Sequence, residues 1–174
     1  KYEGVTHEFI NSDQDNHFEP TDLISLNHFC DGSRRPEKFE DDIRLLRTAL
    51  KDDPKNGRYL FYLAQCLFDL GRYKKALKTY QSRIEIGGWE EEVYYSMLRK
   101  AMCLKHIKED FPISEFVEAH EFRPSRPEAI YEIIKYYREN RCYDIGYSLC
   151  KRQINKPKSQ DILFIDKTIY DYKF

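Results

Sequence analysis

The sequence predicts an all-α protein, a solenoid of helical repeats preceded by a short strand and loop segment. Two observations favour this fold. From about residue 36 onward, apolar residues recur three and four positions apart, which is the spacing of one face of an α-helix. These helical segments also match one another at fixed distances along the chain, as stacked repeats do. The alternative is an irregular helical bundle, because the middle copy is the least regular.

The composition fits a single domain of ordinary size. The chain has 174 residues, and its 29 Lys and Arg against 30 Asp and Glu give a net charge of -1. This balance provides no overall field that attracts phosphates, so we expect no nucleic-acid partner. The apolar runs are far shorter than the roughly 20 residues that a membrane helix needs, so we also expect no membrane span.

Residues 1–35 form the predicted strand and loop segment. Two short apolar stretches, at 5–10 and 23–29, flank the polar residues 11–16, and this pattern predicts two brief strands with a loop between them. The chain opens at Lys1 in a pattern typical of a domain interior. We therefore expect it to be a fragment of a longer protein.

Residues 36–174 are predicted to form the helical repeats, ending in a capping helix. Asn56 is expected to cap one helix at its N-terminus, and Gly71 to end it. Ser125 and Glu128 have the spacing of a capping box for a later helix. The other helices are expected at about 39–50, 73–86 and 90–106, after Pro112, at 143–154, and from Ser159 to the end.

Internal similarity is the strongest signal in the sequence. The segment 60–64 corresponds to 130–134, and the same offset of 70 residues relates Ala76 to Gly146 and Tyr80 to Cys150. A weaker copy, at 94–101, begins 34 residues after Leu60. A period near 34 residues built from two helices resembles the tetratricopeptide repeat. Small residues at these positions let antiparallel helices approach closely, and each pair needs a neighbour to cover its apolar face.

The resemblance to tetratricopeptide repeats implies that partners bind to the concave face, which the first helix of each pair lines. The register predicts that this face presents eight candidate groove residues: Phe61, Tyr62, Gln65, Tyr95, Arg99, Tyr131, Lys135 and Arg138. Tyrosine offers flat apolar area with a hydroxyl group at modest entropic cost, and the cations suit an acidic peptide or a phosphate. The alternative is a solvated face whose tyrosines serve packing.

The remaining chemistry-bearing residues give weaker signals. Asp13, Asp15 and His17 form a pattern that could hold a divalent cation and would make the chain a small metal-dependent enzyme. A polar loop of turn-forming residues is the favoured interpretation, so we predict no metal site. The five cysteines are scattered without a CxxC pair, which favours a reducing compartment and a cytoplasmic location.

The first residues add a second resemblance. Tyr2-x-Gly4-Val5-x-His7-Glu8 resembles the end of the catalytic domain of family 2 glycosyltransferases. Residues 23–46, which include Asp31-Gly32-Ser33-Arg34, look like the junction between that domain and tetratricopeptide repeats in one subgroup, and residues 58–65 and 86–95 look like the subgroup's repeats. The resemblance thus extends over nearly the whole chain.

This resemblance implies that the chain is the C-terminal repeat module of such an enzyme and is not catalytic alone. It would position an acceptor or a protein partner next to the upstream catalytic domain, and the acceptor would be a protein, a peptide or a glycan. His7 and Glu8 would lie at the edge of the active site, whereas the nucleotide sugar and a divalent cation would be bound by the parent enzyme, with no cofactor in this chain. The competing interpretation is a stand-alone tetratricopeptide adaptor that mediates protein–protein interaction.

Overall fold

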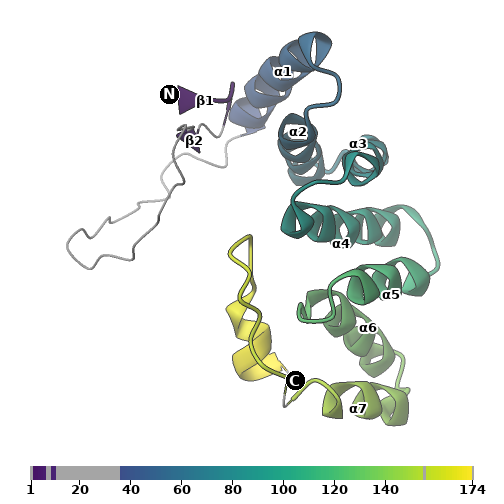
Figure 1. Ribbon diagram of the computed structural model, residues 1–174. Helices are drawn as coiled ribbons and strands as arrows, with labels where there is room; N and C mark the ends of the chain where they lie inside the picture. The colour runs from purple at the N-terminus through teal and green to yellow at the C-terminus, as the bar shows by residue number, and fades with distance from the viewer. Residues whose placement is uncertain (1, 7–8, 11–35, 155, 174) are drawn as a thin grey trace.

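The computed structural model describes residues 2–6, 9–10, 36–154 and 156–173. In this part of the chain each α-helix packs against the next, and Figure 1 shows them as one continuous stack. The helices are α1 (Pro36–Asp52), α2 (Gly57–Asp69), α3 (Tyr73–Ile86), α4 (Glu90–Ile107), α5 (Ile113–Phe122), α6 (Glu128–Glu139) and α7 (Tyr143–Lys151). This arrangement confirms the predicted all-α helical repeat. No helix among the described residues is both long and apolar enough to cross a lipid bilayer.

The N-terminal residues form a small hairpin before the helices. Strands β1 (Tyr2–Glu3) and β2 (Phe9–Ile10) pair in antiparallel fashion. The stretch predicted as the first strand, 5–10, contains β2, whereas β1 lies before it and is followed by Gly4, whose φ of 112° suits the turn. The second predicted strand, at 23–29, lies outside the described residues.

Local signals explain both boundaries of α2. The Asn56 side chain caps α2 by accepting a 3.0 Å hydrogen bond from the Tyr59 backbone N–H. Gly71 follows α2 with a φ of 69°, a conformation that glycine adopts without steric cost. The capping box at α6 is not formed, because Pro127 occupies the N-cap position and the Glu128 carboxylate binds Arg126 and Tyr94 instead.

The small residues of the repeat lie where helices approach closely. Ala64 and Ala76 are fully buried in the core that α1, α2 and α3 share. Gly146 of α7 is also buried, and a Cβ atom there would lie 3.7 Å from the Ile134 carbonyl oxygen of α6. These positions confirm that the 70-residue register aligns equivalent helix contacts.

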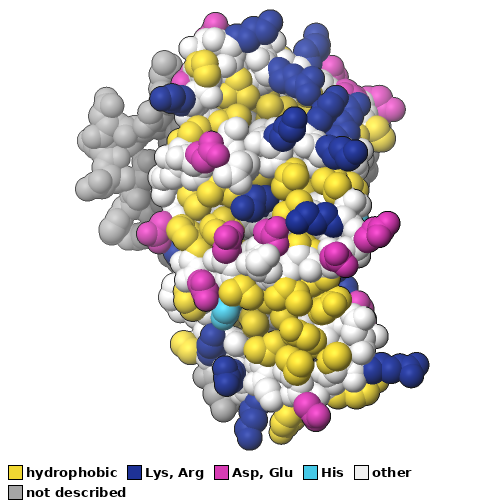
Figure 2. Space-filling model, turned by 90° about the vertical axis from the view of Figure 1, so that its right-hand side faces the viewer, with side chains coloured by type: hydrophobic (Ala, Val, Ile, Leu, Met, Phe, Trp, Pro, Cys, Tyr) yellow, Lys and Arg dark blue, Asp and Glu magenta, His cyan; other side chains and the backbone are white. Residues whose placement is uncertain are grey.

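The two broad faces of the stack differ. We call the side formed by α2, α4 and α6 the inner face. Figure 2 shows a different side, where Lys and Arg gather over the upper part and hydrophobic side chains over the lower part. Exposed hydrophobic side chains in the lower helices include Val117 and Phe122 of α5 and Tyr143, Ile145 and Tyr147 of α7.

The predicted C-terminal helix from Ser159 begins later than expected. Residues 156–166 are not helical, and the chain becomes helical only at Lys167, just before a short π-helix, η1 (Ile169–Lys173), that packs against α6. The segment returns along the inner face (Figure 1). The backbone N–H groups of Ile162 and Leu163 donate to the Glu91 carboxylate of α4. Side chains of the repeats thus take the place of intrahelical carbonyl partners.

Candidate functional site

Two hollows lie next to each other on the inner face and share three lining residues, Tyr95, Arg99 and Phe164. The first hollow, of about 490 Å³, is lined by Lys38, Phe39, Asp42, Tyr62, Gln65, Cys66, Asp69, Tyr95, Arg99 and Phe164. The second hollow, of about 350 Å³, is lined by Tyr95, Leu98, Arg99, Met102, Glu128, Tyr131, Glu132, Lys135, Phe164, Asp166 and Ile169. The C-terminal segment therefore divides this face through Phe164.

The structure brings six of the eight predicted groove residues to these hollows. They are Tyr62 and Gln65 in the first hollow, Tyr131 and Lys135 in the second, and Tyr95 and Arg99 in both. Their role in binding a partner stays a prediction.

Phe61 and Arg138 do not line these hollows. Phe61 is fully buried, and its ring stacks on Phe164 with the two ring centroids 6.3 Å apart. Arg138 is exposed in the last turn of α6 and lines neither hollow. The C-terminal segment covers Phe61, which helical spacing alone does not reveal.

Arg99 is held between aromatic rings where the hollows meet. Its Nε atom donates a 3.1 Å hydrogen bond to the Tyr95 hydroxyl oxygen. Its guanidinium carbon lies 4.3 Å from the ring centroid of Phe68 and 5.2 Å from that of Tyr95. Cation–π contacts of this kind fix the orientation of the cation while leaving some donors available.

Carboxylates accompany the cations of the inner face. In the first hollow, Lys38 and Arg99 are matched by Asp42 and Asp69. The second hollow contains two cations and three carboxylates, which belong to Arg99, Lys135, Glu128, Glu132 and Asp166. Two of these carboxylates are already paired, Glu128 with Arg126 and Glu132 with Lys105. The preference for an acidic partner expected from Arg99 and Lys135 stays a prediction.

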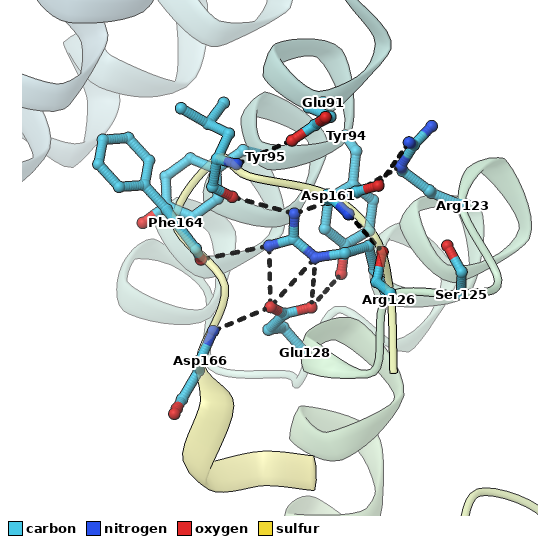
Figure 3. A network of polar contacts seen from close by, with 12 residues as sticks. Glu91, Tyr94, Tyr95, Arg123, Ser125, Arg126, Glu128, Asp161, Phe164 and Asp166 are labelled. Carbon is cyan, nitrogen blue, oxygen red and sulfur yellow. Dashed lines mark hydrogen bonds and ion pairs between the residues drawn. The ribbon is translucent and has the colours of Figure 1, made fainter. Parts of the chain in front are cut away.

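A buried polar network joins α4, the loop before α6 and the C-terminal segment (Figure 3). The side chain of Arg126 is fully buried, and its Nη2 and Nε atoms donate to Glu128 Oε1 at 2.8 Å and Oε2 at 3.0 Å. The Tyr94 hydroxyl also donates to Glu128 Oε2, at 3.2 Å, and the Arg126 guanidinium lies 4.8 Å from the Tyr94 ring centroid. Pairing and hydrogen bonds of this kind offset the cost of burying two charges.

Asp161 brings the C-terminal segment into this network. Its carboxylate accepts two 2.6 Å hydrogen bonds from Arg123 and one of 3.3 Å from Arg126. The hydrogen bonds from Arg123 hold the pKa of Asp161 below its ordinary value, so this carboxylate is charged at neutral pH.

The sequence prediction missed this network. The sequence signal that could have indicated it is the cluster of Arg123 and Arg126 with Pro124 and Pro127 between two predicted helices. Their C-terminal partners lie 35 to 38 residues away in the chain, a separation that helical periodicity does not report.

Within residues 2–6, 9–10, 36–154 and 156–173 there is no group of three His, Cys, Asp or Glu side chains that could hold a metal ion. His7, Glu8, Asp13, Asp15 and His17 lie outside the described residues, so their predicted roles stay predictions. Burial raises the pKa of the Cys66 and Cys103 thiols to about 12, which keeps both protonated at neutral pH.

The comparison with protein families supports the repeat assignment. Residues 37–94 match the sequence model of the tetratricopeptide repeat family, which is about one third of the chain. The match extends from α1 through the α2–α3 pair into the first turn of α4. No curated protein sequence matches the chain. The region is therefore tetratricopeptide-like, and repeats of this kind serve protein–protein interaction.

Proposed function

We propose that this chain is the non-catalytic C-terminal repeat module of a family 2 glycosyltransferase-like protein, and that its inner face binds a polypeptide acceptor or partner. The binding function rests on one observation. Tyrosines from three successive first helices, Tyr62 of α2, Tyr95 of α4 and Tyr131 of α6, line two adjoining hollows. The glycosyltransferase parent is supported by the resemblance of residues 2–8 and 23–46 to the end of that catalytic domain.

The chemistry of the hollows favours recognition by aromatic contact and hydrogen bonding. The three tyrosines are partly buried, so their rings have little conformational freedom to lose when a ligand packs on them. Because each hollow contains carboxylates as well as cations, we expect a partner without a strong net charge. A peptide chain with apolar side chains meets these requirements. A glycan acceptor, which would stack its sugar rings on the same tyrosines, is the other outcome of the test below.

The test is to change Tyr95→Ala together with Arg99→Ala in the intact parent enzyme. Loss of an aromatic anchor costs about 2 kcal/mol of binding, so we expect the KM for the acceptor to rise by about tenfold or more. Donor affinity should stay unchanged and the protein should remain folded, with the melting temperature lowered only by the lost contacts of Arg99 with Phe68 and of Tyr95 with Phe164. Arg138→Ala is the matched control. The sequence predicted this exposed cation as a groove residue too, but it lines neither hollow.

Two outcomes would contradict the proposal. An equal loss of donor affinity would show that the substitutions act on the catalytic domain, and an unchanged acceptor KM would leave the repeats as a structural extension. Comparing peptide and glycan acceptors in the same assay distinguishes the two acceptor classes.

The chain alone should not transfer sugar from any nucleotide donor. The upstream domain would supply the donor site, and His7 and Glu8 alone cannot perform the reaction. Robust turnover by the purified 174-residue chain that disappears in His7→Ala would overturn this part of the proposal and favour a small metal-dependent enzyme.

A stand-alone adaptor is the second candidate function. It is favoured by the family match, which covers only repeat helices. The parent reading frame discriminates between the two candidates. A nucleotide-sugar-binding domain encoded upstream of Lys1 supports the glycosyltransferase module, whereas further repeats at that place support the adaptor.

A further inference from the structure

We propose that the inner face contains a polypeptide-binding site that recognises an Asp followed three positions later by Phe, and that residues 161–164 of the chain occupy this site as an internal competitor. A partner polypeptide with the same two side chains would displace them. The proposal deepens the proposed function by naming the chemistry of the partner, and it rests on that function for the existence of a partner.

The first part of the argument concerns the main chain of the segment. Glu91 Oε2 accepts a 2.8 Å hydrogen bond from each of the backbone N–H groups of Ile162 and Leu163. The Leu163 and Phe164 carbonyl oxygens accept hydrogen bonds from Arg126, at 3.0 Å and 3.2 Å. These four contacts satisfy backbone groups only. They are therefore available to any segment of similar conformation, whatever its sequence.

Two side chains of the segment supply the specificity. The Asp161 carboxylate makes paired 2.6 Å hydrogen bonds with Arg123, a geometry that guanidinium groups favour for carboxylates. The Phe164 ring centroid lies 5.0 Å from that of Tyr95. Between them, Ile162 is 81% exposed, so its identity contributes little to recognition. The site thus distinguishes an acidic residue and an aromatic residue at a fixed spacing.

The repeats themselves hold part of the receptor side in place, although Arg126 and Glu128 also bind the segment. Arg126 is fixed by its paired hydrogen bonds to Glu128 and by its contact with the Tyr94 ring, all of which come from the repeats. Glu128 is fixed in turn by the Tyr94 hydroxyl. A site that is already ordered loses less entropy when it binds a ligand.

The internal segment has features of a replaceable occupant. Phe164 adopts a φ of 47°, in the left-handed region that is unfavourable for a residue with a Cβ atom. Its side chain remains 50% exposed despite the ring contacts. A separate polypeptide need not adopt the strained turn that connects Phe164 to η1. Displacement of the segment would also remove the shared wall of the two hollows, since Phe164 lines both.

The experiment uses the full chain and a fluorescent peptide of residues 158–168. In the chain that carries Asp161→Asn with Phe164→Ala, the internal segment no longer competes, and we expect at least about tenfold tighter peptide binding than in the unmodified chain, where the tethered segment competes at a roughly millimolar effective concentration. The same peptide with both substitutions should bind neither chain. Lys167→Ala, which changes an exposed side chain of the same segment, is the matched control and should behave like the unmodified chain.

A second variant tests the receptor side. Arg123→Ala added to the tail-altered chain removes the main partner of the peptide carboxylate, and it should abolish peptide binding while the melting temperature stays close to that of the tail-altered chain. Equal peptide binding by the tail-altered and unmodified chains would overturn the proposal. So would equal binding of the altered peptide, or persistence of binding without Arg123.

This assay is independent of acceptor use. If the peptide binds as expected while Tyr95→Ala with Arg99→Ala leaves the acceptor KM unchanged, the proposed function fails and the site stands. If the acceptor KM responds while the peptide does not bind, the site fails and the proposed function stands. A concentration-dependent dimer of the unmodified chain that disappears in the tail-altered chain would overturn internal occupancy and make a second copy of the chain the occupant.

Discussion

Helices α3 and α7 occupy the same place in the repeat, yet one is covered and the other is not. Tyr80 of α3 is fully buried, whereas its counterpart Cys150 is only partly buried. Tyr143 at the start of α7 is 62% exposed, and Ile154 just after it is 59% exposed. The difference arises because α4 packs against α3, while no later helix of the described residues packs along α7. The position of a residue in the repeat thus sets the direction in which its side chain points, whereas the helix that follows determines whether that side chain is buried.

The same comparison applies to a buried polar position. Arg83 of α3 and Gln153 after α7 are 70 residues apart, and both are buried. The Arg83 guanidinium donates to Glu92 Oε2 at 2.9 Å and 3.2 Å and to the Gly87 carbonyl oxygen at 2.6 Å. Gln153 Oε1 has no hydrogen-bond partner among the described residues. The helix that follows α3 thus supplies the carboxylate that the buried Arg83 needs. No such helix follows α7 in the described part of the chain, and the equivalent buried residue, Gln153, is neutral.

The largest expected effect comes from removing that partner. Glu92→Ala leaves the buried guanidinium of Arg83 uncompensated, so we expect the free energy of unfolding to fall by about 3–5 kcal/mol. Gln153→Met should change it by less than about 1 kcal/mol. Urea unfolding followed by circular dichroism measures both. Similar effects of the two substitutions would contradict the comparison.

Overpacking the first repeat should have the next largest effect. Ala76 is fully buried where α3 meets the neighbouring helices, so Ala76→Leu should lower the free energy of unfolding by about 1–3 kcal/mol. Thermal unfolding is sufficient to detect this change. An unchanged melting temperature would show that the packing of α3 is assigned to the wrong register.

Enlarging the side chain at Gly146, the position equivalent to Ala76 in the last repeat, should raise the free energy of unfolding instead of lowering it. A Cβ atom at Gly146 would make ordinary contacts of 3.7 Å with α6, and glycine is about 1 kcal/mol less favourable than alanine inside a helix. Gly146→Ala should therefore stabilise the chain by about 0.5–1 kcal/mol. Destabilisation would mean that α6 and α7 lie closer together than the structure indicates.

The smallest expected effect is a difference in the alkylation rates of two cysteine thiols in the unmodified chain. Cys66 is buried with its pKa raised to about 12, whereas Cys142 is exposed at the start of α7. Alkylation at pH 8 should label Cys142 before Cys66, because a protonated and buried thiol reacts slowly. Peptide mass mapping over time gives the order of labelling. Equal rates in the folded chain would show that the first repeat opens as readily as the last.

The repeat helices were predictable because local signals and periodicity agree. The prediction of 73–86 matches α3 from Tyr73 to Ile86, since Gly71 and Gly87 provide positive φ angles at both sides of that helix. Asn56 caps α2 as its position suggested. The inner-face tyrosines followed from the same register.

The C-terminal segment was not predictable by these means. Ile162, Ile165 and Ile169 have helical spacing, but only Ile169 is buried among them, and it lies in η1. Hydrogen bonds from Glu91, at separations of 71 and 72 residues, hold the segment outside a helix. Long-range contacts of this kind carry no periodic signal. The burial of Phe61 beneath Phe164 was missed for the same reason.

Amide hydrogen exchange of the full chain, followed by NMR, most directly tests whether the C-terminal segment occupies the inner face. The Ile162 and Leu163 amides donate to Glu91, so they should exchange slowly, and both should lose protection in Asp161→Asn with Phe164→Ala. Amides in the middle of α2 and α4 should stay protected in both chains. Exchange of Ile162 and Leu163 at the rate of an unstructured peptide in the unmodified chain would contradict the account.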